Sequence, residues 1–263
     1  MWFSEFKSWY QESWIHKWVI IISVAFVMQY ALETFGWFTT LPIERKLHTY
    51  LALQNFREWR VGNLPAFFSY AFLHYGFHHF ILGAIMLYFS GHMLKTFWTD
   101  AQVNRLFILS ILTSGMAFFG STLFISENGT LMGVSGAVFA LLFAATRISP
   151  QMPVYLFGLL RIPLWSISLL FLLVSIAGLD GMNPGGNIAH LGGALTGWIL
   201  AKQPQLLFPR FKSKRKKSAA HLRVVSNSNE MELDAVLDKI GKVGYDALTP
   251  REKAFLAEYG KQK

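Results

Sequence analysis

Two polar residues with catalytic chemistry stand at the start of separate apolar segments. The first is Ser135, within a Gly-x-Ser-Gly run, and the second is His190, which is followed by Gly193 and Gly197. Each has a simple structural explanation, because a serine hydroxyl or a buried imidazole can hydrogen-bond a neighbouring carbonyl. The two glycines share a helix face with His190, however, and let another helix approach the imidazole closely. A serine and a histidine in contact form the nucleophile and general base of a hydrolase.

Their positions along the chain place both residues at one depth in a membrane. Ser135 lies 12 residues before Arg147, and His190 lies 12 residues before Lys202. At the helical rise of about 1.5 Å per residue, each polar group is about 18 Å from a basic residue at the cytoplasmic boundary. This spacing predicts a hydrogen bond between the Ser135 hydroxyl and the His190 imidazole in the outer half of the membrane.

Three histidines mark another candidate site at the start of a different apolar segment, the second along the chain. They are His74, His78 and His79, and the first two are one helical turn apart, a spacing that suits zinc. No carboxylate follows on the next turns of this segment, and the chain has no His-Glu-x-x-His run. The chain has no cysteine, which excludes thiolate ligands. The sequence predicts neither a bound metal nor a cofactor.

Six apolar segments can position these residues as membrane helices. A hydrocarbon core of about 30 Å needs roughly 20 apolar residues in a helix. The fourth and sixth segments are short, but their Gly and Ala content suits helices enclosed by their neighbours. We predict an all-α, six-helix membrane bundle with spans at Trp18–Phe35, Phe77–Leu94, Val103–Phe124, Leu131–Thr146, Leu164–Leu179 and Ile188–Ala201.

Composition supports a membrane domain followed by a polar tail. The chain is 53% hydrophobic and 15% charged, whereas soluble domains carry about 25% charged residues. Lysines and arginines gather beside alternate ends of the spans, which predicts that both termini are cytoplasmic. The predicted parts are an aromatic interfacial segment, the membrane domain, a basic linker and a short helical tail, at residues 1–17, 18–202, 203–230 and 231–263.

The linker and the tail contain their own signals. The basic run at 212–217 supplies much of the net charge of +9. Beside a membrane helix, such a run indicates a topology signal or contact with anionic lipid better than nucleic-acid binding. In the tail, Gly244 predicts the end of one helix, and Thr249, Pro250 and Glu252 predict the capped start of another.

The motifs together resemble the rhomboid family of intramembrane proteases. The resemblance covers about residues 50–202 and rests on two histidines five residues apart, the Gly-x-Ser-Gly run and the Ala-His-x-x-Gly-x-x-x-Gly run. It implies that Ser135 is the nucleophile and that His190 is the general base. It further implies an oxyanion and substrate-binding region with His79, His74, Gly133, Gly83 and the Ser135 backbone N–H, and an aromatic ring, Phe139, stacked on the catalytic imidazole.

Two positions depart from the family pattern. Members usually carry asparagine four residues after the oxyanion histidine, where this chain has Gly83. Loss of one oxyanion donor costs roughly a hundredfold to a thousandfold in rate, so we expect reduced activity or altered specificity. The pair Trp59-Arg60 stands farther before His74 than is usual, and we assign it no role. The tail resembles one found in some bacterial members, which implies a bacterial inner-membrane protein.

The resemblance implies a serine endopeptidase that cleaves transmembrane segments of other membrane proteins through a Ser-His dyad. A pseudoprotease that binds transmembrane helices without cleaving them is the alternative, and Gly83 favours it. A small transporter or channel is a third reading, but it predicts ionisable residues at several depths. The expected partners are transmembrane substrates and the lipid bilayer, without nucleic acid, and the tail is a candidate for docking on a cytoplasmic partner.

Overall fold

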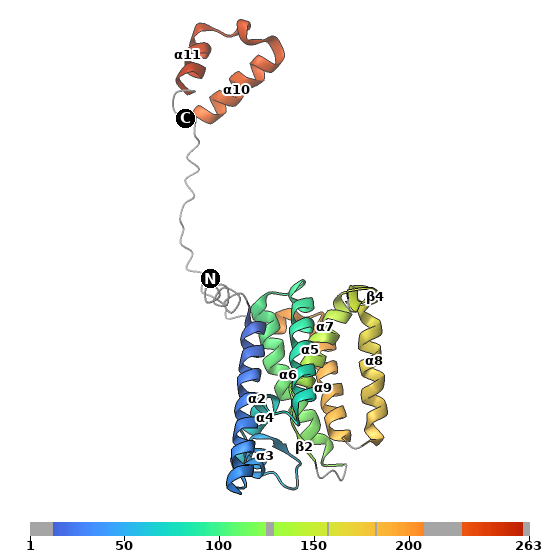
Figure 1. Cartoon of the computed structure of the whole chain (residues 1–263). Helices are drawn as coiled ribbons and strands as arrows, with labels where there is room; N and C mark the ends of the chain where they lie inside the picture. Colours follow the sequence, from blue (N-terminus) through green and yellow to red (C-terminus); the bar gives the residue numbers. More distant parts are fainter. Residues whose placement is uncertain (1–12, 125–128, 157, 182, 208–227, 260–263) are drawn as a thin grey trace. The chain divides into compact units, whose positions relative to one another are not determined.

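The computed structural model describes residues 13–124, 129–156, 158–181, 183–207 and 228–259, and most of them are helical (Figure 1). The chain separates into two compact units, Met1–Pro209 and Arg210–Lys263. Most of the predicted interfacial segment and the basic run of the linker lie outside the described residues.

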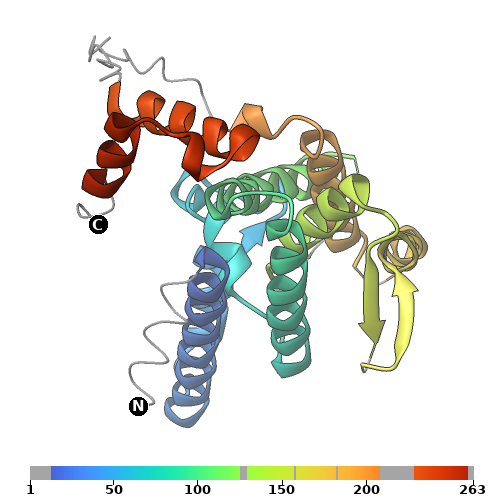
Figure 2. The same ribbon diagram turned by 90° about the horizontal axis from the view of Figure 1, so that it is seen from above.

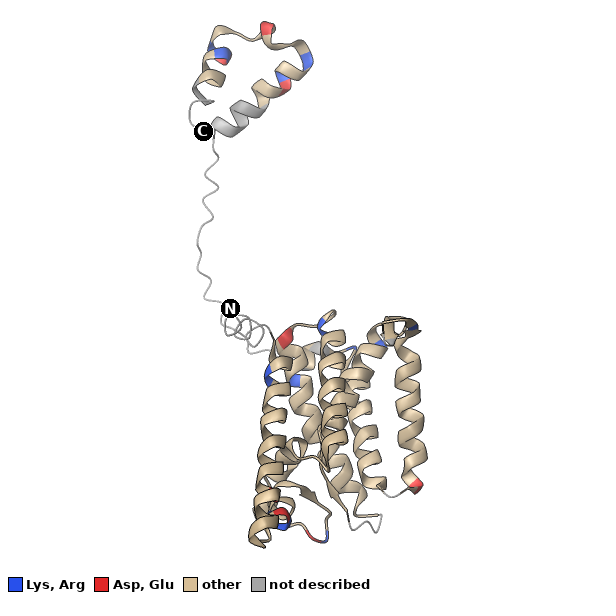
Figure 3. Cartoon of the chain, in the orientation of Figure 1, with Lys and Arg blue, Asp and Glu red and all other residues tan. Residues whose placement is uncertain are grey.

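Helices occupy all six predicted segments of the first unit. Three of these helices are long and apolar enough to cross a membrane, namely α2 (Trp14–Thr39), α5 (Phe77–Lys95) and α6 (Asp100–Ser121). The shorter three are α7 (Ser135–Ile148), α8 (Leu164–Ala177) and α9 (Pro184–Leu200). Charged residues gather at the two ends of this bundle, and other residue types occupy its middle (Figure 3). This distribution suits insertion into a bilayer, where charges are costly.

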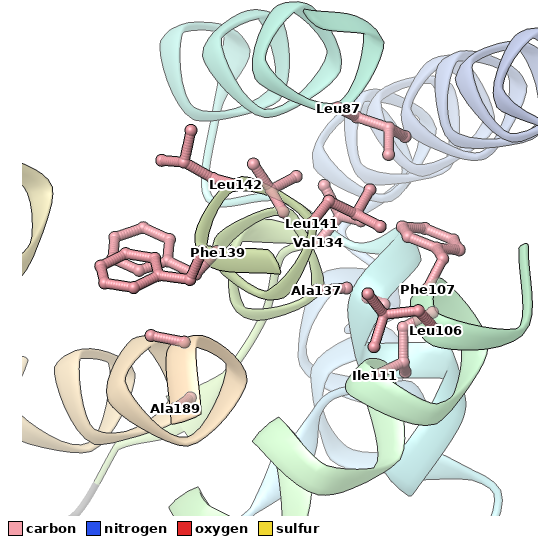
Figure 4. Packing of buried hydrophobic residues seen from close by; sticks show 14 of the residues in the cluster. Leu87, Leu106, Phe107, Ile111, Val134, Ala137, Phe139, Leu141, Leu142 and Ala189 are labelled. Atoms are coloured by element: carbon pink, nitrogen blue, oxygen red, sulfur yellow. The ribbon is translucent and has the colours of Figure 1, made fainter. Parts of the chain in front are cut away.

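The most enclosed helix is α7, which α5, α6 and α9 surround (Figures 1 and 4). Every residue from Gly136 to Thr146 is buried. Its 14 residues extend only about 21 Å, less than the hydrocarbon core of about 30 Å. The predicted start at Leu131 was wrong, because β2 (Thr130–Leu131) pairs there with β1 (Leu53–Gln54) and the helix begins at Ser135.

Helix α9 packs against α7 through its glycines. A Cβ on Gly193 would collide with the carbonyl oxygen of Gly136, and a Cβ on Gly197 would collide with that of Ala140. No side chain therefore separates the two backbones at these points. The position of α9 beside α7 is fixed by backbone contact, as the small-residue pattern predicts.

Hydrogen bonds tie α2 to distant parts of the bundle. The Ser13 hydroxyl donates to Asp100 Oδ1 at 2.6 Å, and the Trp14 N–H donates to Oδ2 of the same carboxylate at 3.1 Å. Farther along α2, Gln29 Nε2 donates to the His74 carbonyl at 2.9 Å, and Gln29 Oε1 accepts from the His74 N–H at 2.9 Å. The connection that contains His74 also carries α3 (Ile43–Leu51) and α4 (Ala66–Ser69).

The connection between α7 and α8 is a β-hairpin, which the hydropathy pattern did not predict. Its strands, β3 (Pro153–Leu156) and β4 (Leu160–Pro163), are antiparallel. Gly158 in the turn has a φ of 71°, in the left-handed region that favours glycine. Helix α8 follows β4 directly, and its buried residues are Leu164, Ser168 and Ser175.

The second unit contains α10 (Ser228–Val243) and α11 (Pro250–Tyr259). Gly244, with a φ of 82°, follows the end of α10 as predicted. The predicted cap of α11 is also confirmed, because the Thr249 N–H donates to the Glu252 carboxylate at 2.7 Å. Lys239 Nζ lies 2.8 Å from Glu252 Oε1, and this ion pair connects the two helices.

Candidate active site

Ser135 begins α7, and its Oγ lies 2.7 Å from Nε2 of His190 in α9. The contact predicted from equal depth is therefore present. Gly133 has a φ of 109°, a conformation that favours glycine, and it turns the chain into α7. No side chain caps the N-terminus of α7. The first N–H groups of a helix lack intrahelical partners and carry partial positive charge, so this terminus suits a developing anion.

Two side chains hold the imidazole of His190. The Phe139 ring stacks on it, with centroids 4.4 Å apart and planes 11° apart. The Ser175 hydroxyl of α8 lies 3.4 Å from Nδ1 of His190, and Ser175 is 1% exposed. If Nδ1 carries the proton and donates to Ser175, Nε2 accepts from the Ser135 hydroxyl, as a general base must. Ser175 gave no sequence signal, because a lone serine in an apolar helix normally bonds a preceding carbonyl.

His79 faces the turn that precedes Ser135. A Cβ on Gly133 would lie 2.8 Å from Nε2 of His79, so only glycine fits there. The Tyr75 N–H donates to Nδ1 of His79 at 3.5 Å, and the Tyr75 ring stacks on the imidazole with centroids 5.9 Å apart. A neutral imidazole that accepts at Nδ1 carries its hydrogen at Nε2. That hydrogen points toward the turn. The Gly133 N–H itself donates to the Tyr70 carbonyl at 2.9 Å, so Gly133 contributes space instead of a hydrogen bond.

His74 and Gly83 lie behind His79. The rings of His74 and His79 meet edge to face with centroids 5.2 Å apart. His74 is 1% exposed, and neither ring nitrogen has a hydrogen-bond partner among the described residues. Burial lowers the pKa of His74 to about 4, and the neighbouring His79 adds to this effect, so the imidazole is neutral at physiological pH. A Cβ on Gly83 would lie 3.6 Å from Nε2 of His74.

A cavity of about 210 Å³ opens over these residues. His79, Ser135 and His190 line it, and Gly83 lines it as well. Its remaining wall is mainly apolar and comes from α5, α7 and α8, through Leu82, Met86, Val138, Phe139, Leu142, Phe171 and Val174, while Ser175 of α8 and Asn187 of α9 add two polar residues. Such a cavity accepts an apolar side chain next to the serine.

His78 takes no part in this cluster. It is exposed and does not line the cavity, although it is adjacent to His79 in the sequence. Within the described ranges, no group of three or more His, Asp or Glu side chains is arranged to hold a metal ion. The arrangement that the structure does present is a hydroxyl, an imidazole and a second imidazole around one apolar cavity.

Comparison with known families identified two matching regions. A family model described as Rhomboid domain matches residues 58–203, more than half of the chain. A second model, described as a family of unknown function (DUF6576), matches residues 225–262, which include α10 and α11. No curated protein matches the chain.

Proposed function

Because this chain belongs to the rhomboid family and is an integral membrane protein, we propose that it is an intramembrane serine endopeptidase. The observation that carries the proposal is the distance of 2.7 Å between Ser135 Oγ and His190 Nε2, with the imidazole stacked on Phe139. Substrates are the transmembrane segments of other membrane proteins, and neither metal nor cofactor takes part.

In the proposed reaction, Ser135 Oγ attacks the carbonyl carbon of the scissile peptide while His190 Nε2 accepts the hydroxyl proton. His190 then gives this proton to the leaving amine, and an acyl-enzyme remains on Ser135. A water molecule, deprotonated by His190, releases the acyl group and regenerates the serine. Among the described residues, His190 hydrogen-bonds Ser135 and Ser175 and no carboxylate, so we propose a dyad. Ser175 accepts from Nδ1 and keeps the imidazole in the required tautomer.

The oxyanion that forms in each step needs donors around the carbonyl oxygen. The backbone N–H of Ser135 and Nε2–H of His79 are the proposed donors, because both face the turn that contains Gly133. Preorganised donors of this kind are each worth roughly a hundredfold to a thousandfold in rate. A substrate helix must unwind to present its carbonyl here, so cleavage near small or helix-breaking residues is expected.

The competing proposal is a pseudoprotease that binds transmembrane helices without cutting them. Gly83 favours it, because this residue offers no side-chain donor beside His79. The contact between Ser135 and His190 favours the enzyme instead. A protein that only binds has no need to hold an imidazole 2.7 Å from a serine hydroxyl.

The test combines covalent labelling with cleavage. Purified protein is incubated with a fluorescent serine-reactive phosphonate and, separately, with a generic transmembrane substrate. We expect the wild type to be labelled and to cleave, whereas Ser135→Ala and His190→Ala do neither. Ser23→Ala is the matched control, because Ser23 lies in α2, donates to the Val19 carbonyl, and does not line the cavity. Substrate binding with neither labelling nor cleavage by the folded wild type would establish the pseudoprotease.

The orientation in the membrane is part of the same proposal. We place all six helices, α2 and α5 to α9, across the bilayer, with the shorter α7 and α9 enclosed by their neighbours. Both termini are cytoplasmic, the membrane is a bacterial inner membrane, and the tail is available to a cytoplasmic partner. Protease accessibility of a tag on the C-terminus in inverted membrane vesicles tests this orientation.

A further inference from the structure

The hairpin between α7 and α8 exposes large apolar side chains. Leu159 in the turn is 90% exposed, Leu160 at the start of β4 is 59% exposed, and Tyr155 in β3 is 59% exposed. The strands lie at the edge of the bundle beside α8 (Figure 2). Exposed aliphatic side chains on a protruding hairpin are unfavourable in water, so this surface needs a partner.

The strand register separates two faces of the hairpin. Val154 pairs with Ile162, and Leu160 lies two residues before Ile162 on the same face. Tyr155 pairs with Arg161 on the opposite face. The hairpin is therefore amphipathic, with an aliphatic face and a face that carries an aromatic hydroxyl and a positive charge.

The aliphatic face of the hairpin is continuous with the hydrophobic core of the bundle and with the exposed apolar face of α8. Val154 packs against the hydrophobic core of the bundle, whereas Leu160 lies beyond that core. Helix α8 begins directly after β4 and presents exposed apolar side chains at Trp165, Leu169, Leu170 and Leu173. In an integral membrane protein, such a helix face contacts lipid. The apolar strip of the hairpin thus runs from the core into the lipid-facing surface.

The other face suits the headgroup layer. Tyrosine and arginine place an apolar body near acyl chains and a polar tip near phosphate groups. None of the ion pairs among the described residues involves Arg161. Its charge is available to an anionic lipid headgroup, and attraction of this kind is worth about 1 kcal/mol per basic residue near the surface.

From these observations we infer that the β3–β4 hairpin is an interfacial membrane anchor, whose occupant is the lipid bilayer. Leu159 and Leu160 enter the boundary between headgroups and acyl chains, and Arg161 contacts lipid phosphate. The anchor holds the start of α8, a helix that buries few of its own residues and contributes Phe171, Val174 and Ser175 to the cavity. The inference does not depend on whether the protein cleaves substrates.

The natural absence of cysteine permits a direct test. Leu160→Cys and Arg161→Cys are labelled with an environment-sensitive fluorophore in the full chain and reconstituted into vesicles of phosphatidylcholine and phosphatidylglycerol. Some vesicles contain lipids with a quencher high on the acyl chain. Leu170→Cys on α8 is the positive control, and Tyr245→Cys in the second unit is the negative control.

We expect quenching at position 160 close to that at position 170, and at least about twofold stronger than at position 161, because interfacial elements bury their apolar face roughly 5–10 Å deep. Leu159→Cys repeats the measurement at the turn if the label at position 160 prevents folding. Equal quenching at positions 160 and 161, or no quenching at 159 and 160, would overturn the anchor. A blue-shifted but unquenched label would also overturn it, because another protein would then cover the hairpin.

Discussion

Asparagine in place of Gly83 adds a donor to the cavity at a site that can hold it. A Cβ at this position lies 3.3 Å from Val134 Cγ1 and 3.6 Å from His74 Nε2, so a small shift of the Val134 side chain suffices. The new amide reaches an imidazole that has no partner among the described residues. One fully preorganised oxyanion donor is worth about 2.7–4 kcal/mol. Since His74 competes for this amide, we expect about 1.4 kcal/mol, a tenfold increase in kcat/KM.

The assay compares Gly83→Asn with wild type and with Gly83→Ala, which adds the Cβ without a donor. Cleavage of a fluorogenic transmembrane substrate gives kcat/KM, and titration with the serine-reactive probe gives the active fraction. Gly83→Ala should leave kcat/KM within about twofold of wild type, since a small shift of the Val134 side chain accommodates its methyl group. The thermal midpoint of Gly83→Asn should rise, because a buried hydrogen bond contributes about 1 kcal/mol. If Gly83→Asn is no faster than Gly83→Ala, position 83 does not face the oxyanion.

Three further predictions follow. Gly193→Ala should lower cleavage about a hundredfold, because the methyl group forces α9 away from the α7 backbone and a 1 Å misplacement costs about this much. Gly120→Ala, whose Cβ meets no atom within 4 Å, should retain wild-type rates. Equal losses of cleavage rate in the two variants would refute the role of the backbone contact between α9 and α7. Ser175→Ala should lower kcat about fivefold with little change in KM, since one neutral hydrogen bond contributes about 1 kcal/mol, and an unchanged pH profile of kcat would argue against its role on the imidazole. In the tail, the bond from Lys239 lowers the pKa of Glu252 from 4.5 to about 2, so its stabilising contribution is complete above about pH 4.5 and is lost as the pH falls through 2. Amide hydrogen exchange of the intact protein should show this loss, and Glu252→Gln should abolish the pH dependence.

The sequence was sufficient to locate the helices and the central contact of the site. Apolar runs bounded by charged residues are a strong signal, and a helix occupies each of the six predicted segments. The depth argument worked because Ser135 and His190 each have a basic residue 12 positions further along the chain. Because both helices run in the same direction, an equal number of residues to the basic position places Ser135 and His190 at the same height. The glycines of α9 determine which face of that helix packs against α7.

Other features could not be predicted because they depend on partners distant in the sequence. Ser175 matters only because α8 places its hydroxyl 3.4 Å from an imidazole on α9. Tyr75 supports His79 through a backbone N–H, which every residue type has. The hairpin was missed because Pro153 and Pro163 at its ends, and Gly158 in its turn, are also typical of irregular loops.

The carboxylate of Asp100 accepts hydrogen bonds from the first residues of α2, and this has a consequence for biosynthesis. Asp100 lies 87 residues after Ser13, so the ribosome makes the first helix well before its capping partner exists. Until α6 emerges, water or lipid headgroups must satisfy the Trp14 N–H, whereas the Ser13 side chain already accepts from the Ile15 N–H. The contact between the start of α2 and α6 therefore forms late, when α6 inserts. A nascent chain arrested after His74 but before Asp100 should hold α2 through Gln29 while the start of the helix lacks its partner.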